Sequence, residues 1–192
     1  VATPHLGAST EEAQEKVARQ IAVQMADALK ERGITGAVNA EAIQLAMRKE
    51  LQPFIILAEK LGTLQAQLMR GQLQKMTIAC SGSFVTQATE LITASALKGL
   101  LSHLLTEPVN LINSPVIAKE MGITIDEKRE SAHISYTHLI ALRYQTDKET
   151  RKFAGTVFGN SQVRIVQIDD YHMEIHPEGH LLLYKNVDKP GM

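Results

Sequence analysis

The chain has 192 residues, of which 20 are lysine or arginine and 21 are aspartate or glutamate, so its formal net charge is -1. Such a balance gives no long-range field to attract nucleic acid or an anionic membrane, so any anion site must be local. The single cysteine, Cys80, excludes an intramolecular disulfide and favours a reducing compartment. We recognise no membrane span or signal peptide and expect a soluble, cytoplasmic protein.

A long first helix is predicted to begin at Ser9 and to end at Gly33. Ser9 is a good N-cap residue, and Glu12 follows three residues later, which is the spacing of a capping box. Apolar residues then recur at helical spacing: Ala13, Val17, Ile21, Met25 and Ala28. The stretch 34–39 contains glycine and has no helical period, so we expect a linker and a domain boundary there.

The middle of the chain predicts helices and one short strand. A weak helix is expected over 41–48, and a stronger one begins at Pro53, because proline suits the first turn of a helix. The apolar run 75–81 predicts a strand. Two further helices are expected over 93–105 and 108–121.

From residue 123 onward the apolar pattern changes to a period of two, which is typical of strands. Six segments fit it: ITIDEKRES (123–131), YTHLIALRY (136–144), KFAGTVF (152–158), VRIVQI (163–168), YHMEI (171–175) and HLLLYKN (180–186). With the preceding elements they predict an α+β fold, in which helices pack on a mostly antiparallel sheet.

His5 is the first candidate for chemistry. It follows an extended Thr3-Pro4 segment and precedes Gly7 and the first helix, so the imidazole would lie at a corner where a ligand can approach the backbone. A general base at neutral pH suits such a position. It also needs an orienting carboxylate, and no partner is evident nearby, so an ordinary loop histidine stays open as the alternative.

Two other groups have simpler structural explanations. His172, Glu174 and His176 alternate and would share one strand face, with His180 nearby, but a solvated strand face explains this pattern better than a metal site does. Cys80 lies inside an apolar strand without a basic neighbour, which predicts a buried, unreactive thiol.

Basic residues gather at one predicted strand end: Lys128, Arg129, His133 and, upstream, Lys119. They could hold a small anion or effector through charge-assisted hydrogen bonds. In the alternative interpretation, the neighbouring glutamates pair with the same cations and the cluster is only a solvated strand end.

The segment VATPHLGASTEEAQ (1–14) resembles the close of the nucleotide-binding domain in D-isomer-specific 2-hydroxyacid dehydrogenases, most closely the phosphoglycerate dehydrogenases. The resemblance continues in order through ELQPFIILAEKLGTLQAQL, ALKGLL, VNLINSPVIAKEMGI, AGTVFG, RIVQID and PEGHLLLYKNVDKPGM, as in the long three-domain form. It implies a division into three parts. Residues 1–36 would end a Rossmann-type nucleotide-binding region, 37–178 would form an intervening allosteric substrate-binding domain, and 179–192 would begin an ACT domain.

The resemblance also implies an activity. His5 would be the catalytic acid/base, and Leu6, Gly7 and Ala8 would border the nicotinamide of NAD, with no metal. The parent enzyme would be a homo-oligomer that oxidises 3-phosphoglycerate to 3-phosphohydroxypyruvate on the route to serine. The phosphate loop, the substrate-binding arginine and the glutamate that pairs with the histidine would lie upstream. We therefore expect a catalytically silent piece of a longer polypeptide.

Two alternatives stay open. The intervening domain has relatives in bacterial L-serine dehydratases, so residues 39–178 could belong to a non-catalytic regulatory module that binds a small anion; TPHLGAST (3–10) argues against that parent. The first helix could also serve mainly in oligomerisation, because the corresponding helix of the dehydrogenases contributes to their dimer.

Overall fold

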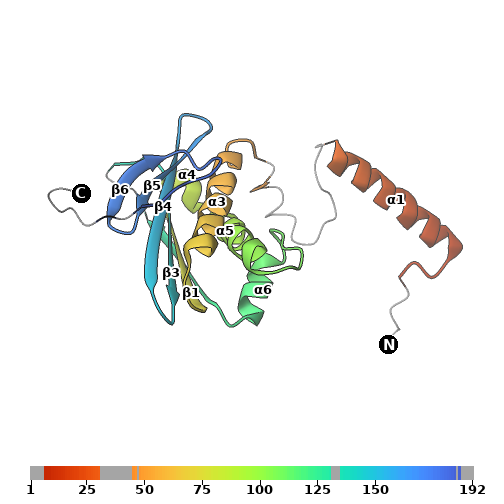
Figure 1. The fold of residues 1–192 in the computed structure, drawn as a ribbon. Helices are drawn as coiled ribbons and strands as arrows, with labels where there is room; N and C mark the ends of the chain where they lie inside the picture. Colours follow the sequence, from red (N-terminus) through yellow and green to blue (C-terminus); the bar gives the residue numbers. More distant parts are fainter. Residues whose placement is uncertain (1–6, 31–44, 47, 131–134, 185, 187–192) are drawn as a thin grey trace. The chain divides into compact units, whose positions relative to one another are not determined.

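The structure is a computed structural model that describes residues 7–30, 45–46, 48–130, 135–184 and 186 (Figure 1). The chain divides into two compact units, Val1–Leu51 and Gln52–Met192. No helix in the described ranges is long and apolar enough to cross a membrane. The predicted linker 34–39 and most of the weak helix predicted over 41–48 lie outside these ranges.

The first unit contains the long helix α1 (Glu11–Leu29), which confirms the predicted helix. Its N-cap is Thr10, whose side-chain oxygen accepts a hydrogen bond from the Ala13 N–H at 3.2 Å. The predicted Ser9 cap is therefore wrong by one residue. The reason is the backbone: Thr10 is extended, with φ -108° and ψ 153°, directly before the helical residues, which is the conformation of an N-cap.

Helices of the second unit begin with α3 (Gln52–Leu68), α4 (Ser83–Thr86) and α5 (Thr89–Leu104). The helix predicted from Pro53 and that predicted over 93–105 are confirmed as α3 and α5. The helix predicted over 108–121 is only partly right, because α6 spans Ser114–Glu120. Before it, Asn110 Oδ1 accepts from the Ile112 and Asn113 N–H groups at 2.8 and 2.9 Å, so side chains hold the backbone in a turn.

Six strands of the second unit form one sheet in the order β2-β1-β3-β4-β5-β6. They are β1 (Leu73–Ser81), β2 (Thr124–Glu130), β3 (Leu139–Thr146), β4 (Thr150–Phe158), β5 (Gln162–Ile168) and β6 (Tyr171–Ile175). Among the strands that the structure describes, only β1 and β2 pair in parallel, and α5 and α6 lie between them in sequence, as a parallel crossover requires. The predicted α+β fold with a mostly antiparallel sheet is confirmed.

The strand predicted over 180–186 is wrong. Residues 180–184 carry no strand, and Leu182 is 93% exposed. Alternating apolar residues favour an extended backbone, but a strand also needs a neighbouring strand to accept its hydrogen bonds. In the described part of the sheet, β6 is the last strand at this edge.

Helices α3 and α5 lie side by side against one face of the sheet (Figure 1). Their contact is close at Gly62 and Gly99, where an added Cβ would overlap the backbone of the facing helix. The core between helices and sheet is apolar: Leu57, Leu61, Ile78, Leu97, Leu100, Ile140, Leu142, Tyr144 and Phe153. Residues at the alternate strand positions lie on the opposite face, where the candidate site is found.

Candidate functional site

A hollow of about 590 Å³ lies on this opposite face of the sheet, over β1, β2, β3 and β4. Its floor consists of small side chains, because Ala79 of β1 pairs with Ala141 of β3 and Thr77 is the next residue of β1 on the same face. Longer side chains on the neighbouring positions surround this floor. The depression therefore follows directly from the sizes of side chains that face the same way.

Four basic side chains line the hollow, and three of them, Lys128, Arg143 and Lys152, have no ion-pair partner in the described ranges. Arg143 of β3 and Lys152 of β4 lie directly opposite each other, and Lys128 of β2 is paired with Ala79 on the far side of the floor. Like charges at directly opposed strand positions are destabilising. A bound anion would relieve the repulsion between Arg143 and Lys152 and so stabilise the folded protein.

The acidic side chains of the hollow do not neutralise these three. Asp126 forms an ion pair with Lys75 at 3.1 Å, and Glu130 accepts a hydrogen bond from the Ser81 hydroxyl at 2.9 Å. Lys128, Arg143 and Lys152 form no ion pair with any residue in the described ranges. Of the two carboxylates in the hollow, only Glu130 has no basic partner, and it is outnumbered by the three unpaired cations. The hollow therefore attracts small anions locally, although the chain as a whole is nearly neutral.

Residues 50–169 match the family described as the D-3-phosphoglycerate dehydrogenase intervening domain. The chain belongs to this family. It is similar to the D-3-phosphoglycerate dehydrogenases of Archaeoglobus fulgidus (35% identical over 192 residues) and Synechocystis (34% over 194 residues). The matches include 100% of this chain but only 36% and 35% of those relatives. The enzyme of Bacillus subtilis is 32% identical over 192 residues and is matched over 37% of its length. The chain therefore spans little more than a third of its relatives, and the resemblance expected from the sequence is confirmed.

The intervening domain separates the basic residues that the sequence grouped together. Consecutive strand residues point to opposite faces, so Arg129 lies on the helix side, where its guanidinium is 3.8 Å from the Glu90 carboxylate. Lys119 of α6 also lies on that side and lines a small cleft with Glu90 and Glu127. Lys128 alone of the predicted residues lines the sheet-face hollow, and His133 lies outside the described ranges.

Arg143 and Lys152 were missed by the sequence analysis. The Thr146 N–H donates to the Glu149 carbonyl at 2.8 Å, which closes a two-residue hairpin loop between β3 and β4. Counting three residues outward from this pair in each strand places Arg143 opposite Lys152. The signal was therefore in the sequence, but it required the loop residues of the hairpin to be known.

Hydrogen bonds at the hairpin fix the strands that carry these two cations. The Tyr144 hydroxyl and the Arg70 N–H donate to Glu149 Oε1 at 2.6 and 2.9 Å. Burial opposes ionisation of Glu149, but these two donors, together with the positive charges of Arg151 and Arg70, hold the pKa of the carboxyl below its usual value. The charged form of Glu149 therefore stabilises the β3–β4 connection next to Arg143.

The other groups considered in the sequence have structural roles. Cys80 is fully buried and burial raises the pKa of its thiol to about 12, which confirms the prediction of a buried, unreactive cysteine. Glu174 pairs with Arg164 at 3.3 Å, and His176 lies 3.4 Å from Glu178. Within the described ranges, no three His, Cys, Asp or Glu side chains are grouped so that they could hold a metal ion.

The proposed catalytic turn belongs to the first unit. His5 and Leu6 lie outside the described ranges. Gly7 is exposed in a turn before α1, and Ala8 adopts a left-handed backbone with φ 49°. The role of His5 stays a prediction.

Proposed function

We propose that this chain is part of a D-3-phosphoglycerate dehydrogenase and that its intervening domain binds a small phosphate- or carboxylate-bearing effector on the open face of the sheet. The observation that carries the proposal is the pairing of Arg143 with Lys152, opposite Lys128, without ion-pair partners in the described ranges. Charge-assisted hydrogen bonds from these side chains supply the binding energy, and each contributes roughly 1.5–3 kcal/mol before screening by salt.

The activity of the whole protein is proposed from the names of the relatives. The parent would oxidise 3-phosphoglycerate to 3-phosphohydroxypyruvate on the route to serine, in the cytoplasm. His5 would take the proton from the C2 hydroxyl, and NAD would accept the hydride from C2. The 192-residue chain alone would be inactive, because it contains no GxGxxG phosphate loop.

The two described residues of the turn, Gly7 and Ala8, are small enough to lie next to a nicotinamide ring. Residues 7 and 8 are glycine and alanine, so they themselves contribute no side chain larger than a methyl group at the backbone that a flat ring would approach. Leu6, Gly7 and Ala8 would position the ring, and His5 would hold or accept the proton at the substrate hydroxyl.

The apolar stripe of α1 supports the proposed homo-oligomer. Val17, Ile21 and Met25 share one side of the helix and are 47%, 49% and 61% exposed within the described chain. Native mass spectrometry of the parent tests this proposal, because a monomer would contradict it. We also propose that an ACT domain begins at residue 179, as the resemblance implies.

The anion site is tested by titrating the 192-residue chain with phosphate and following its melting temperature and backbone amide NMR shifts. Binding to the folded state raises the melting temperature by linkage. Arg143→Gln and Lys128→Gln should each remove most of that rise. Arg129→Gln is the matched control, because it removes a charge from the same strand as Lys128 but from the opposite face, and it should leave the rise intact.

Two outcomes would contradict the proposal. If phosphate shifts neither the melting temperature nor the amide signals, the three cations are only solvated. If Arg129→Gln abolishes the effect and Arg143→Gln does not, the effector binds on the helix side of β2.

A further inference from the structure

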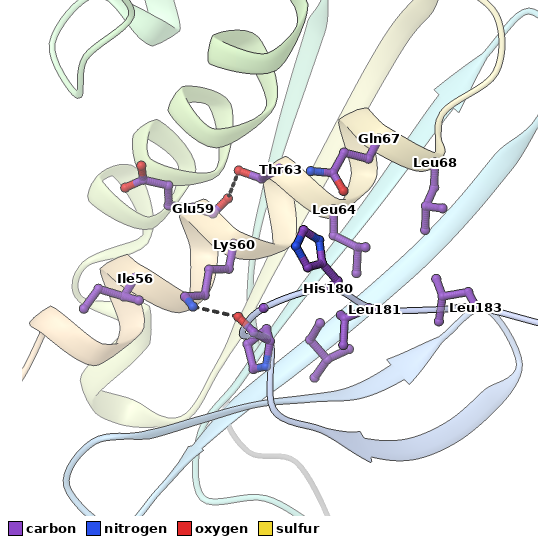
Figure 2. A pocket seen from close by; sticks show the side chains of 13 residues that line it. Ile56, Glu59, Lys60, Thr63, Leu64, Gln67, Leu68, His180, Leu181 and Leu183 are labelled. Carbon is purple, nitrogen blue, oxygen red and sulfur yellow. Dashed lines mark hydrogen bonds between the residues drawn. The ribbon is translucent and has the colours of Figure 1, made fainter.

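A second hollow, of about 840 Å³, lies between α3 and the segment 177–183 of the same unit (Figure 2). Volumes between about 300 and 1,000 Å³ are typical of small-molecule sites. This hollow shares none of its lining residues with the sheet-face site. Neither the family description nor the proposed effector site explains it.

The walls of this hollow are largely apolar. Leu64 and Leu68 line it from one side of α3, and Leu181 and Leu183 line it from the opposite segment. Leu182, between the last two, is 93% exposed, whereas Leu181 and Leu183 are 41% and 40% exposed. Leu181 and Leu183 thus line the hollow (Figure 2), whereas Leu182 between them is turned toward solvent.

One end of the hollow carries a positive charge. Lys60 Nζ donates a hydrogen bond to the Pro177 carbonyl at 2.7 Å, which uses one of its three N–H groups (Figure 2). The neighbouring Glu59 carboxylate does not neutralise it, because both Glu59 oxygens contact Lys98 Nζ, at 2.8 and 2.9 Å. Lys60 is half-buried and retains two donors for a ligand.

We propose that this hollow binds an aliphatic carboxylate. The carboxylate accepts hydrogen bonds from Lys60, and the hydrocarbon chain lies between Leu64 and Leu68 on the helix and the two leucines of the facing segment. Lys60 and Leu68 are eight residues apart, or about 12 Å along a helix, so the site fits a medium-length chain and not only a small acid. The His180 imidazole and the Gln67 amide, which also line the hollow, offer further polar contacts.

A ligand in this hollow would connect α3 with the segment 177–183. Among the described contacts, the hydrogen bond from Lys60 to Pro177 is one that ties residues 177–183 to α3, and all three leucines of that segment are at least 40% exposed. A ligand that contacts both walls would hold the segment against the helix. Amide hydrogen exchange at Leu181 and Leu183 would then slow when the ligand binds.

The test uses the 192-residue chain and octanoate, with amide NMR shifts as the readout. We expect saturable shifts at Leu64, Leu181 and Leu183, and these shifts should saturate at lower octanoate concentrations than any shift at Arg143 or Lys152. Lys60→Met should weaken octanoate binding by about tenfold or more, because a hydrogen-bonded charge partner is lost. Lys148→Met is the matched control, since this exposed lysine lies in the β3–β4 hairpin, outside the lining.

Leu183→Ser provides a second variant that leaves the Lys60–Pro177 hydrogen bond in place, and it should also weaken octanoate binding. The inference is overturned if octanoate produces no saturable shifts, or if Lys60→Met and Leu183→Ser both bind it as wild type does. It is equally overturned if 1-octanol, which lacks the carboxylate, binds as tightly. Phosphate titrations report on the sheet-face site through Arg143, so the two sites succeed or fail separately.

Discussion

The two faces of the sheet differ in how their side chains are satisfied. On the helix side, Leu61 and Leu100 are fully buried, and the buried Gln65 amide donates to the Leu142 carbonyl at 3.1 Å. On the open side, small residues leave a hollow and Arg143 lies opposite Lys152. One face contributes stability, and the other gives up some stability and gains a local positive field. The same strands supply both, because their side chains alternate.

The largest effect is expected on the helix side. Leu61→Ala removes a fully buried side chain between α3, α5 and the sheet, so the free energy of unfolding should fall by about 2–5 kcal/mol, as is typical for such cavities. Urea unfolding followed by circular dichroism measures the change. Leu104→Ala is the control, because Leu104 is 41% exposed, and it should cost less than about 1 kcal/mol.

An intermediate effect is expected at the hairpin that connects β3 and β4. Tyr144→Phe removes the hydroxyl that donates to Glu149 and should lower the free energy of unfolding by about 0.5–1.5 kcal/mol at neutral pH. The folded-state pKa of Glu149 is depressed, so its contribution is present above the unfolded pKa and is lost as pH falls through the folded pKa. As the pH is lowered from about 5 through the range in which carboxyl groups become protonated, Tyr144→Phe should therefore lose less stability than wild type does. An identical acid limb in both proteins would refute this role of Glu149.

The smallest effect should have the opposite sign. Lys152→Thr removes one of two opposed like charges on the open face, so it should raise the free energy of unfolding by about 0.2–1 kcal/mol. Lys75→Thr tests whether threonine itself stabilises the strand, because Lys75 has an acidic partner, Asp126. We expect a gain only for Lys152→Thr, measured without phosphate at low salt. A loss of stability there would mean that Lys152 is not repelled by Arg143.

Some errors in the sequence analysis show where pattern alone is insufficient. The alternation of 180–186 resembles that of a true strand, yet the described residues of this segment have no strand beside them. The adjacency of Lys128 and Arg129 suggested one cluster, yet alternation sends them to opposite faces. In the first case the missing information is the neighbour across the sheet, whereas in the second the separation already follows from the alternation of the predicted strand.

The sequence by itself determined the fold class, six of the seven strands that were predicted, the helices α1, α3 and α5, and the burial of Cys80. These features depend on local apolar periodicity and on residues such as Pro53 that act within a single turn. The tertiary structure alone decided that Arg143 meets Lys152 across a hairpin and that Lys60 faces Pro177, 117 residues away in sequence. Such contacts depend on strand register and on how distant segments pack, and neither property is encoded in the periodicity of one segment.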